Sequence, residues 1–461
     1  MMKRIRLYLI IAVAVLSLSR CAPKLVKSEL KAPDSWIFGR DIDVDSLELP
    51  IKWWVIFGDT TLNGLITKAL DNNRNLAAAA TTVESAQANI KALRSGYLPS
   101  LSLDAYGENE YTYSDKNIQE YYVQPTISWE IPLFGSLRQT NKSTRAEYAA
   151  TEWALRAMRL SIAAEVATTY FTLQQTMSNL EIARKTYDLR STEAALIDSM
   201  FYYGMSDGVA RDQAMSLKYS AKSDISEYSR DVEQIRMTLS TLLGENPGGI
   251  NGRVSPDVPH EIIEGLLPQS IPMILPSQLL ERRPDIIESY YKMESAAAKV
   301  GIARAERYPT LSITAEGGIL GSTIKSLTSS HPWSWTFIGE ITQPIYNFGG
   351  LKNKEMMARQ NYMESLYNYE EAMLTAFSEV EKALIAIKTY AIQREAAAKL
   401  VGTNAAVAMK VNALYDNGMN DYLNVIDAER ELYDAQMNLV AIITEQYISY
   451  VTLFKALGGG Y

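Results

Sequence analysis

Apolar and polar residues alternate with a period of two in four stretches of the chain, two in each half, which is typical of β-strands with one apolar face. In residues 121–134, Val123, Ile127 and Trp129 point one way, and Gln124 and Thr126 point the other. The same alternation runs through about 98–113, 308–320 and 333–346. We therefore predict four strands, in two pairs, with the polar stretch 114–120 connecting the first pair.

Long runs without proline follow each strand pair. Residues 137–202 contain neither proline nor glycine, and 351–416 contain a single glycine. A helix of that length spans roughly 100 Å, too long for the core of an ordinary domain, so it favours a coiled coil or helical array. Shorter runs at 208–243 and 421–457 predict returning helices. A further helix is predicted over 61–95, ending before Pro99.

The pattern occurs twice. Gly204, Met205 and Asp207 recur as Gly418, Met419 and Asp421, 214 positions later. We predict two repeats, 60–246 and 277–457, joined by a segment rich in proline and glycine at 247–276, with a tail at 458–461.

The turn between the helices of each repeat has its own signature. A glycine at a helix end, here Gly204 and Gly418, supplies the left-handed backbone of a C-cap. Asp207 and Asp421 are expected to cap the helices that follow. Each repeat is thus expected to contain an antiparallel helix hairpin.

The first twenty residues are typical of a bacterial lipoprotein signal peptide. Lys3, Arg4 and Arg6 precede an apolar run at 7–19, which is too short to span a bilayer. Cys21 follows directly and is the expected lipidation site, with residues 21–59 as a tether. Arg20 departs from the usual small residue, and an ordinary signal peptide with an incidental cysteine is the alternative.

Composition excludes several classes of protein. The net charge of −8 becomes −12 once residues 1–20 and their four basic residues are removed (41 basic against 53 acidic), which argues against a nucleic-acid partner. The mean hydropathy of −0.11 argues against a polytopic helical membrane protein. The single cysteine excludes an intramolecular disulfide framework and a Cys-rich metal cluster, and the two histidines, far apart in sequence, argue against a His-based metal site. We find no catalytic constellation and expect neither enzymatic activity nor a cofactor.

The strand count predicts an oligomer. A membrane sheet must close, and four strands cannot, since the smallest barrels have about eight. Three chains would give twelve strands and two would give eight; the polar residues on one face suit a watery lumen and favour three. Trp129, Trp333 and Trp335 would then face lipid. The alternative is a soluble sheet with these tryptophans in its core.

The chain resembles outer membrane factors of the TolC type, specifically the lipoprotein branch that serves resistance-nodulation-division efflux pumps. The resemblance covers nearly all of the mature chain and includes LPSQLLERRPDI (275–286), GIARAERYPTLSI (301–313) and GMNDYLNVIDAERELYDAQ (418–436). It implies an α+β homotrimer in the outer membrane, with a 12-stranded β-barrel continued by a 12-helix α-barrel. It also implies a periplasmic adaptor and an inner-membrane transporter as partners.

The resemblance further implies where the pore closes. Leu423 and Asp427 match the apolar and acidic constriction residues of the lipoprotein branch, and Asn424 stands where TolC has a second acidic residue. Three Asp427 side chains would attract cations, and a ring of Leu423 would close the pore by dewetting. Gly204, Asp207, Gly418 and Asp421 lie at tips that would contact the adaptor.

The predicted function is a passive efflux duct for small molecules. The same architecture could serve Cu⁺ or Ag⁺ efflux or type I protein secretion. A lipid-anchored periplasmic coiled-coil scaffold is the alternative of a different class, although a scaffold has no need of four duplicated strands.

Overall fold

A computed structural model describes residues 25–39, 44–45, 51–113, 115–248, 271–272, 276–328 and 332–459. The signal peptide, Cys21 and most of the joint at 247–276 lie outside these residues. The chain divides into two compact units. The first unit contains the residues up to Leu30, Thr81–Trp153 and Ile287–Ala372. The second unit contains Lys31–Ala80, Ala154–Ile286 and Met373–Tyr461.

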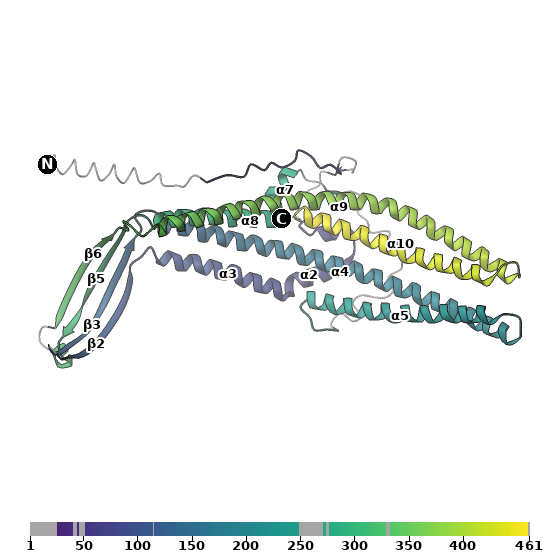
Figure 1. The fold of residues 1–461 in the computed structure, drawn as a ribbon, viewed down its shortest axis with the longest axis horizontal. Coiled ribbons are helices and arrows are strands. Elements are labelled where there is room, and N and C mark those ends of the chain that lie inside the picture. Colours follow the sequence, from purple (N-terminus) through teal and green to yellow (C-terminus); the bar gives the residue numbers. More distant parts are fainter. Residues whose placement is uncertain are drawn as a thin grey trace. The chain divides into compact units, whose positions relative to one another are not determined.

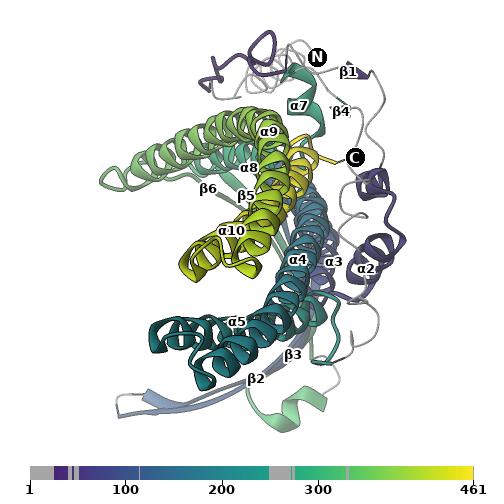
Figure 2. The ribbon, with the colours of Figure 1, turned by 90° about the vertical axis from the view of Figure 1, so that its right-hand side faces the viewer.

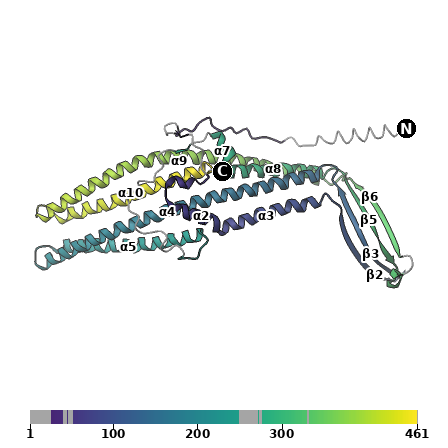
Figure 3. The ribbon, with the colours of Figure 1, turned by 180° about the vertical axis from the view of Figure 1, so that it is seen from behind.

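The first unit contains the four predicted strands, which are confirmed. They are β2 (Ser100–Thr112), β3 (Asp115–Ile131), β5 (Thr310–Gly321) and β6 (Trp333–Thr342). All neighbours are antiparallel, in the order β2-β3-β5-β6, as Figures 1 and 3 show. The 3-10 helix η2 (Ile324–Thr328) follows β5. The two strand pairs of the two halves therefore join into one sheet through β3 and β5.

The strand register separates the two faces of this sheet. Rows of paired residues cross all four strands and alternate in character. An apolar row is formed by Leu101, Ile127, Ala315 and Phe337, and the next row is formed by Ser102, Thr126, Glu316 and Thr336. One face is therefore apolar and the other polar, as the alternation predicts.

Two strand limits differ from the prediction. The stretch 114–120 was predicted to be a connection, but β3 already begins at Asp115, and Glu108 lies opposite Glu120 in the ladder. Ladder hydrogen bonds join backbone groups, so pairing continues past the point where apolar residues stop. β6 ends at Thr342, two residues before Pro344, which has no backbone N–H to donate.

Helix α8 (Pro284–Ala305) packs against the first part of α4 (Ser136–Tyr202) within the first unit. The hydroxyls of Ser143 and Ser295 hydrogen-bond at 2.9 Å. At Gly301 an added Cβ would lie 2.8 Å from the side chain of Gln139. The helices thus approach closely where their residues are small.

The predicted helix 61–95 is two helices, α2 (Thr60–Asn72) and α3 (Arg74–Ser95). Asn73 between them is extended, with ψ of 126°. Its side-chain oxygen accepts from the N–H groups of Asn75 and Leu76, so it caps α3, and its amide donates to the carbonyl of Leu242. A capping asparagine with a tertiary partner breaks the helix although no proline is present.

Two long helices dominate the chain: α4 and α9 (Gly350–Asp416), of 67 residues each. Each turns into a returning helix of 35 residues, α5 (Gly208–Leu242) or α10 (Tyr422–Ala456). Figure 2 shows the resulting hairpins, α4–α5 and α9–α10, nearly end on. The predicted helix hairpins are therefore present.

An aromatic core lies in the second unit. The 3-10 helix η1 (Trp53–Phe57) places Trp53 against Phe454, with stacked rings 5.6 Å apart. Phe57 is fully buried, and Phe171 and Tyr447 stack at 4.7 Å. These contacts fix the end of α10 against α4.

The remaining elements of the second unit are short. Two-residue strands β1 (Val44–Asp45) and β4 (Ile271–Pro272) pair in parallel, and α7 (Pro276–Arg282) precedes α8. The N-terminal segment lies on α9, because the Glu381 carboxylate accepts from the backbone N–H groups of Ile37 and Phe38.

Candidate functional site at the helix-hairpin tips

The α9–α10 tip is a capped turn. Gly418 has a φ of 71°, the left-handed conformation predicted for it. The N–H groups of Gly418 and Met419 donate to the carbonyls of Tyr415 and Leu414 at 2.8 and 2.9 Å, which satisfies carbonyls at the end of α9. Asp421 is the N-cap of α10, as predicted, and accepts from the N–H of Leu423.

The α4–α5 tip has the same construction. Gly204 has a φ of 74°, and Asp207 accepts from the N–H of Ala210 at 2.7 Å. Tyr202, Tyr203 and Met205 are largely exposed around this turn. The predicted glycine and aspartate roles are therefore confirmed at both tips, whereas contact with an adaptor stays a prediction.

One face of α10 packs into a core shared by the two hairpins. Tyr422, Val425 and Ile426 are buried against Ala194 and Ile197 of α4. Ala214 of α5 completes this cluster, and Tyr415 of α9 packs on its edge, with its ring 5.4 Å from that of Tyr422. The start of α10 is thus held by apolar contacts with both helices of the other hairpin.

The opposite face of α10 carries the predicted constriction residues. Leu423, Asn424 and Asp427 are all exposed, Leu423 to 49%. The spacing i, i+1, i+4 puts them on one helix face. Asn424 and Asp427 line a groove completed by Asn404, Val407 and Val411 of α9. The structure therefore brings the three predicted residues together on the surface of the chain.

Arg430 is a residue of this face that the sequence reasoning missed. Its guanidinium lies 3.0 Å from the Asp427 carboxylate, and both side chains are more than half exposed. Such a pair contributes little stability but offsets part of the negative charge. The i,i+3 spacing of an acidic and a basic residue was the available signal. Beyond it, Glu431 and Asp434 continue an exposed acidic face.

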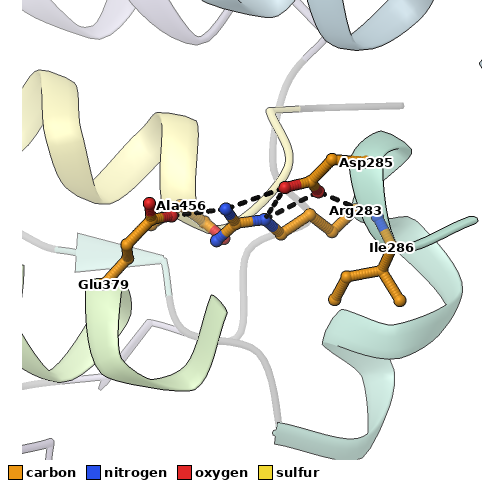
Figure 4. Close-up of polar contacts among 5 residues, drawn as sticks. All are labelled: Arg283, Asp285, Ile286, Glu379 and Ala456. Carbon is orange, nitrogen blue, oxygen red and sulfur yellow. Dashed lines mark hydrogen bonds and ion pairs between the residues drawn. The ribbon is translucent and has the colours of Figure 1, made fainter. Parts of the chain in front are cut away.

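A second missed cluster centres on Arg283, between α7 and α8 (Figure 4). Its guanidinium bonds the Asp285 carboxylate at 2.8 to 3.1 Å, the Glu379 carboxylate on α9, and the carbonyl of Ala456 at the end of α10, 3.3 Å away. Burial alone would lower the pKa of Arg283, but the bond to Asp285 and the charge of Glu379 raise it above its ordinary value. The cluster ties three segments together.

The three predicted lipid-facing tryptophans have different surroundings. Trp333 and Trp335 on β6 are 80% and 82% exposed on the single chain. Trp129 is half-buried, and its indole N–H donates to the carbonyl of Tyr97 at 3.2 Å. A lipid contact stays a prediction for all three.

Among the residues that the structure describes, no group of three or more His, Cys, Asp or Glu side chains could hold a metal ion. None of the helices in the described ranges is long and apolar enough to cross a membrane.

The comparisons with known proteins decide the family. The model of the family described as outer membrane efflux protein matches residues 65–245 and 275–459, which is most of the chain. The chain belongs to this family. Outer membrane efflux channels are not enzymes, and the outer membrane is where this protein resides.

Curated relatives of the family export different compounds. The chain is 32% identical over 413 residues to the toluene efflux pump outer membrane protein TtgI of Pseudomonas putida, covering 88% of this chain and 86% of the relative. It is 30% identical to the probable outer membrane lipoprotein SilC of Salmonella typhimurium and 29% identical to the cation efflux system protein CusC of Escherichia coli K12, with about the same coverage.

Solved structures share the fold. The chain superposes on crystallographic CusC with a TM-score of 0.82, at 28% identity, covering 95% of this chain and all of that one. The Campylobacter jejuni CmeC outer membrane channel matches with a TM-score of 0.84 at 24% identity, covering 95% of each chain. The predicted fold class, a TolC-type channel with a four-stranded sheet per chain, is confirmed.

Proposed function

We propose that the chain is the outer membrane subunit of a tripartite efflux pump, in which three copies form a passive duct for small molecules. The sheet of the first unit carries this proposal. Its faces differ in polarity, and within the described residues the outer edges of β2 and β6 pair with no further strand. Such edges in lipid require partners, and three chains supply twelve strands with the polar face toward a lumen.

A duct of this kind needs an energy source and a periplasmic connection. We propose an inner-membrane resistance-nodulation-division transporter as that source and a periplasmic adaptor as the connection. The proposed adaptor contacts are the exposed residues of the α4–α5 tip, such as Tyr202, Tyr203 and Met205, and the α9–α10 tip around Gly418.

Cys21 is the proposed lipid anchor, and Cys21→Ala should abolish acyl labelling.

The substrate is proposed from the relatives. Relatives at 32% identity include a solvent and a toluene efflux protein, so apolar small molecules are the first candidates. Export of soft cations such as Cu⁺ or Ag⁺ is the second, because CusC is a cation efflux protein and thioethers bind soft metals. Met356, Met357 and Met409 of α9 are exposed on the chain rather than packed, which supports this second candidate.

The periplasmic constriction is proposed at Leu423 and Asp427. On the threefold axis three leucines would exclude water and three carboxylates, each beside Arg430, would select for cations. The test is single-channel conductance of the double variant Leu423→Ala, Asp427→Ala in planar bilayers. We expect conductance to rise, because both rings are removed.

The matched control is Asp434→Ala, which removes an exposed carboxylate from the same helix further from the tip. Its conductance should equal that of the unchanged protein. An unaltered conductance in the double variant would contradict the constriction, and a rise in the control of equal size would show a general charge effect instead.

A further inference from the structure

Two carboxyl groups from different hairpins lie together beside the shared core, Glu429 buried and Glu193 half-buried. Glu193 lies on α4, one residue before the core residue Ala194, and Glu429 lies on α10, where it is 8% exposed. The two carboxyls share a hydrogen bond. One oxygen of Glu193, Oε2, is buried and has no partner among the described residues. Two ionised carboxylates have no proton to share, so this contact requires one protonated carboxyl.

A buried arginine balances the charge of this pair. Arg190 is 4% exposed, one turn before Glu193 on α4. Its guanidinium lies 5.5 Å above the Tyr433 ring of α10 and is 3.5 Å from the carbonyl of Leu217 on α5. With one proton on the two carboxyls, the cluster of Glu193, Glu429 and Arg190 is neutral. Without it, the cluster buries one uncompensated negative charge.

Titratable groups face the cluster from all four helices of the two hairpins. Apart from the pair and Arg190, they are acids and phenols and none is basic. They are Tyr415 and Asp416 of α9, Tyr422 and Tyr433 of α10, and, around Tyr433, Asp224 and Tyr228 of α5. Arg190 is therefore the only cation that these contacts provide, and the surroundings favour the protonated pair.

We propose that Glu193 and Glu429 form a proton-dependent latch that holds the start of α10 against α4, closed when one carboxyl is protonated and released when both are ionised. The latch joins the two hairpins directly behind the exposed face of α10. Its release would let Tyr422, Val425 and Ile426 leave the shared core. Alkaline pH should therefore loosen the packing of the two hairpins.

The pKa of Glu193 sets the pH window. Burial, followed by the hydrogen bond and charge of Glu429, raises this pKa to about 8, from an ordinary value of 4.5. A carboxyl whose pKa is higher in the packed state stabilises that state fully below the ordinary pKa. The contribution is then lost as pH rises toward the raised value. The latch should weaken between about pH 5 and pH 8.

The consequence for the pore depends on the proposed function. The exposed residues Leu423 and Asp427 lie on the same two turns of α10 as the buried Tyr422 and Ile426. Any movement of this segment away from α4 moves both proposed constriction residues. If three such segments line the pore, a released latch widens it, and conductance should rise with pH.

The first test measures hydrogen exchange of the full-length detergent-solubilised protein at pH 6 and pH 8, corrected for intrinsic exchange rates. Peptides covering 415–433 should lose protection by about tenfold or more. Between the two pKa values, each rise of one pH unit lowers the equilibrium constant for latch closure by up to about tenfold. Glu193→Gln keeps the shape and a permanent proton donor, so its protection should stay high at both pH values. Glu429→Gln should behave in the same way.

The control is Asp198→Asn, which neutralises an exposed carboxylate five residues further along α4. It should keep the pH response of the unchanged protein. A flat response in the unchanged protein, an undiminished response in both glutamine variants, or a response lost in the control would each overturn the latch.

Conductance of the same proteins separates the latch from the proposed constriction. We expect higher conductance at pH 8 than at pH 6, abolished by Glu193→Gln. If hydrogen exchange changes with pH as the latch predicts while conductance does not change with pH, the constriction at α10 is refuted and the latch is not.

Discussion

Removal of the Arg283 guanidinium should release the end of α10. In Arg283→Ala, the carboxylates of Asp285 and Glu379 and the carbonyl of Ala456 all lose their shared donor (Figure 4). Removing one member of a buried ion pair costs about 3–5 kcal/mol. Here the two acidic side chains are 44% and 42% exposed and can be rehydrated, so we expect a smaller loss, about 2–3 kcal/mol.

The assay is hydrogen exchange at the last two turns of α10, residues 450–456, in the detergent-solubilised protein. A loss of 2–3 kcal/mol corresponds to a roughly 30- to 150-fold fall in protection. Arg283→Lys keeps the positive charge but not the planar guanidinium with its several N–H donors, so it should lose less protection than Arg283→Ala. Arg282→Ala is the matched control, since it removes the neighbouring arginine and leaves the bonded one. A less than threefold change in Arg283→Ala, or an equal change in the control, would refute the role assigned to the cluster.

Further predictions concern the backbone. Gly418→Ala should destabilise the α9–α10 tip by about 1 kcal/mol, because the left-handed φ of 71° strains any residue with a Cβ although nothing lies within 4 Å. Gly64→Ala, within α2 and equally unobstructed, should instead stabilise α2 by about 0.5–1 kcal/mol. The chemical denaturation midpoints of the two variants should therefore shift in opposite directions. Gly318→Val should impair formation of the sheet, since a Cβ there would lie 2.3 Å from the carbonyl oxygen of Val123 on β3; heat-resistant assembly on gels should fall, and unchanged assembly would show that β5 can shift.

The local elements could be predicted because their signals are local. Alternation at Val123, Ile127 and Trp129 identifies a strand, and the glycine-aspartate pairs at 204–207 and 418–421 identify both hairpin tips. The break at Asn73 was missed because its cause is partly tertiary: the asparagine amide reaches the Leu242 carbonyl, 169 positions away. The early start of β3 was missed because backbone pairing does not depend on side-chain polarity.

The polar clusters could not be predicted for the same reason. Arg283 and Glu379 are 96 positions apart in sequence, and Arg283 and Ala456 are 173 apart. The LERRPDI segment identified a helix start, yet nothing in it distinguishes Arg283 from Arg282 as the buried residue. Glu193 and Glu429 come from different halves of the chain, and the sequence alone predicts for each an ordinary carboxylate on an amphipathic helix. Only the packing of the hairpins brings them together.

The assembly is the central claim, because the four-stranded sheet, the lumen and the constriction all depend on it. The most direct test is the mass of the detergent-extracted protein by light scattering, with conductance measured on the same sample. We predict a protein mass near three chains of 51.5 kDa, slightly less after signal-peptide removal, together with a conducting pore. A single-chain mass that stays in solution without detergent would contradict the shared barrel.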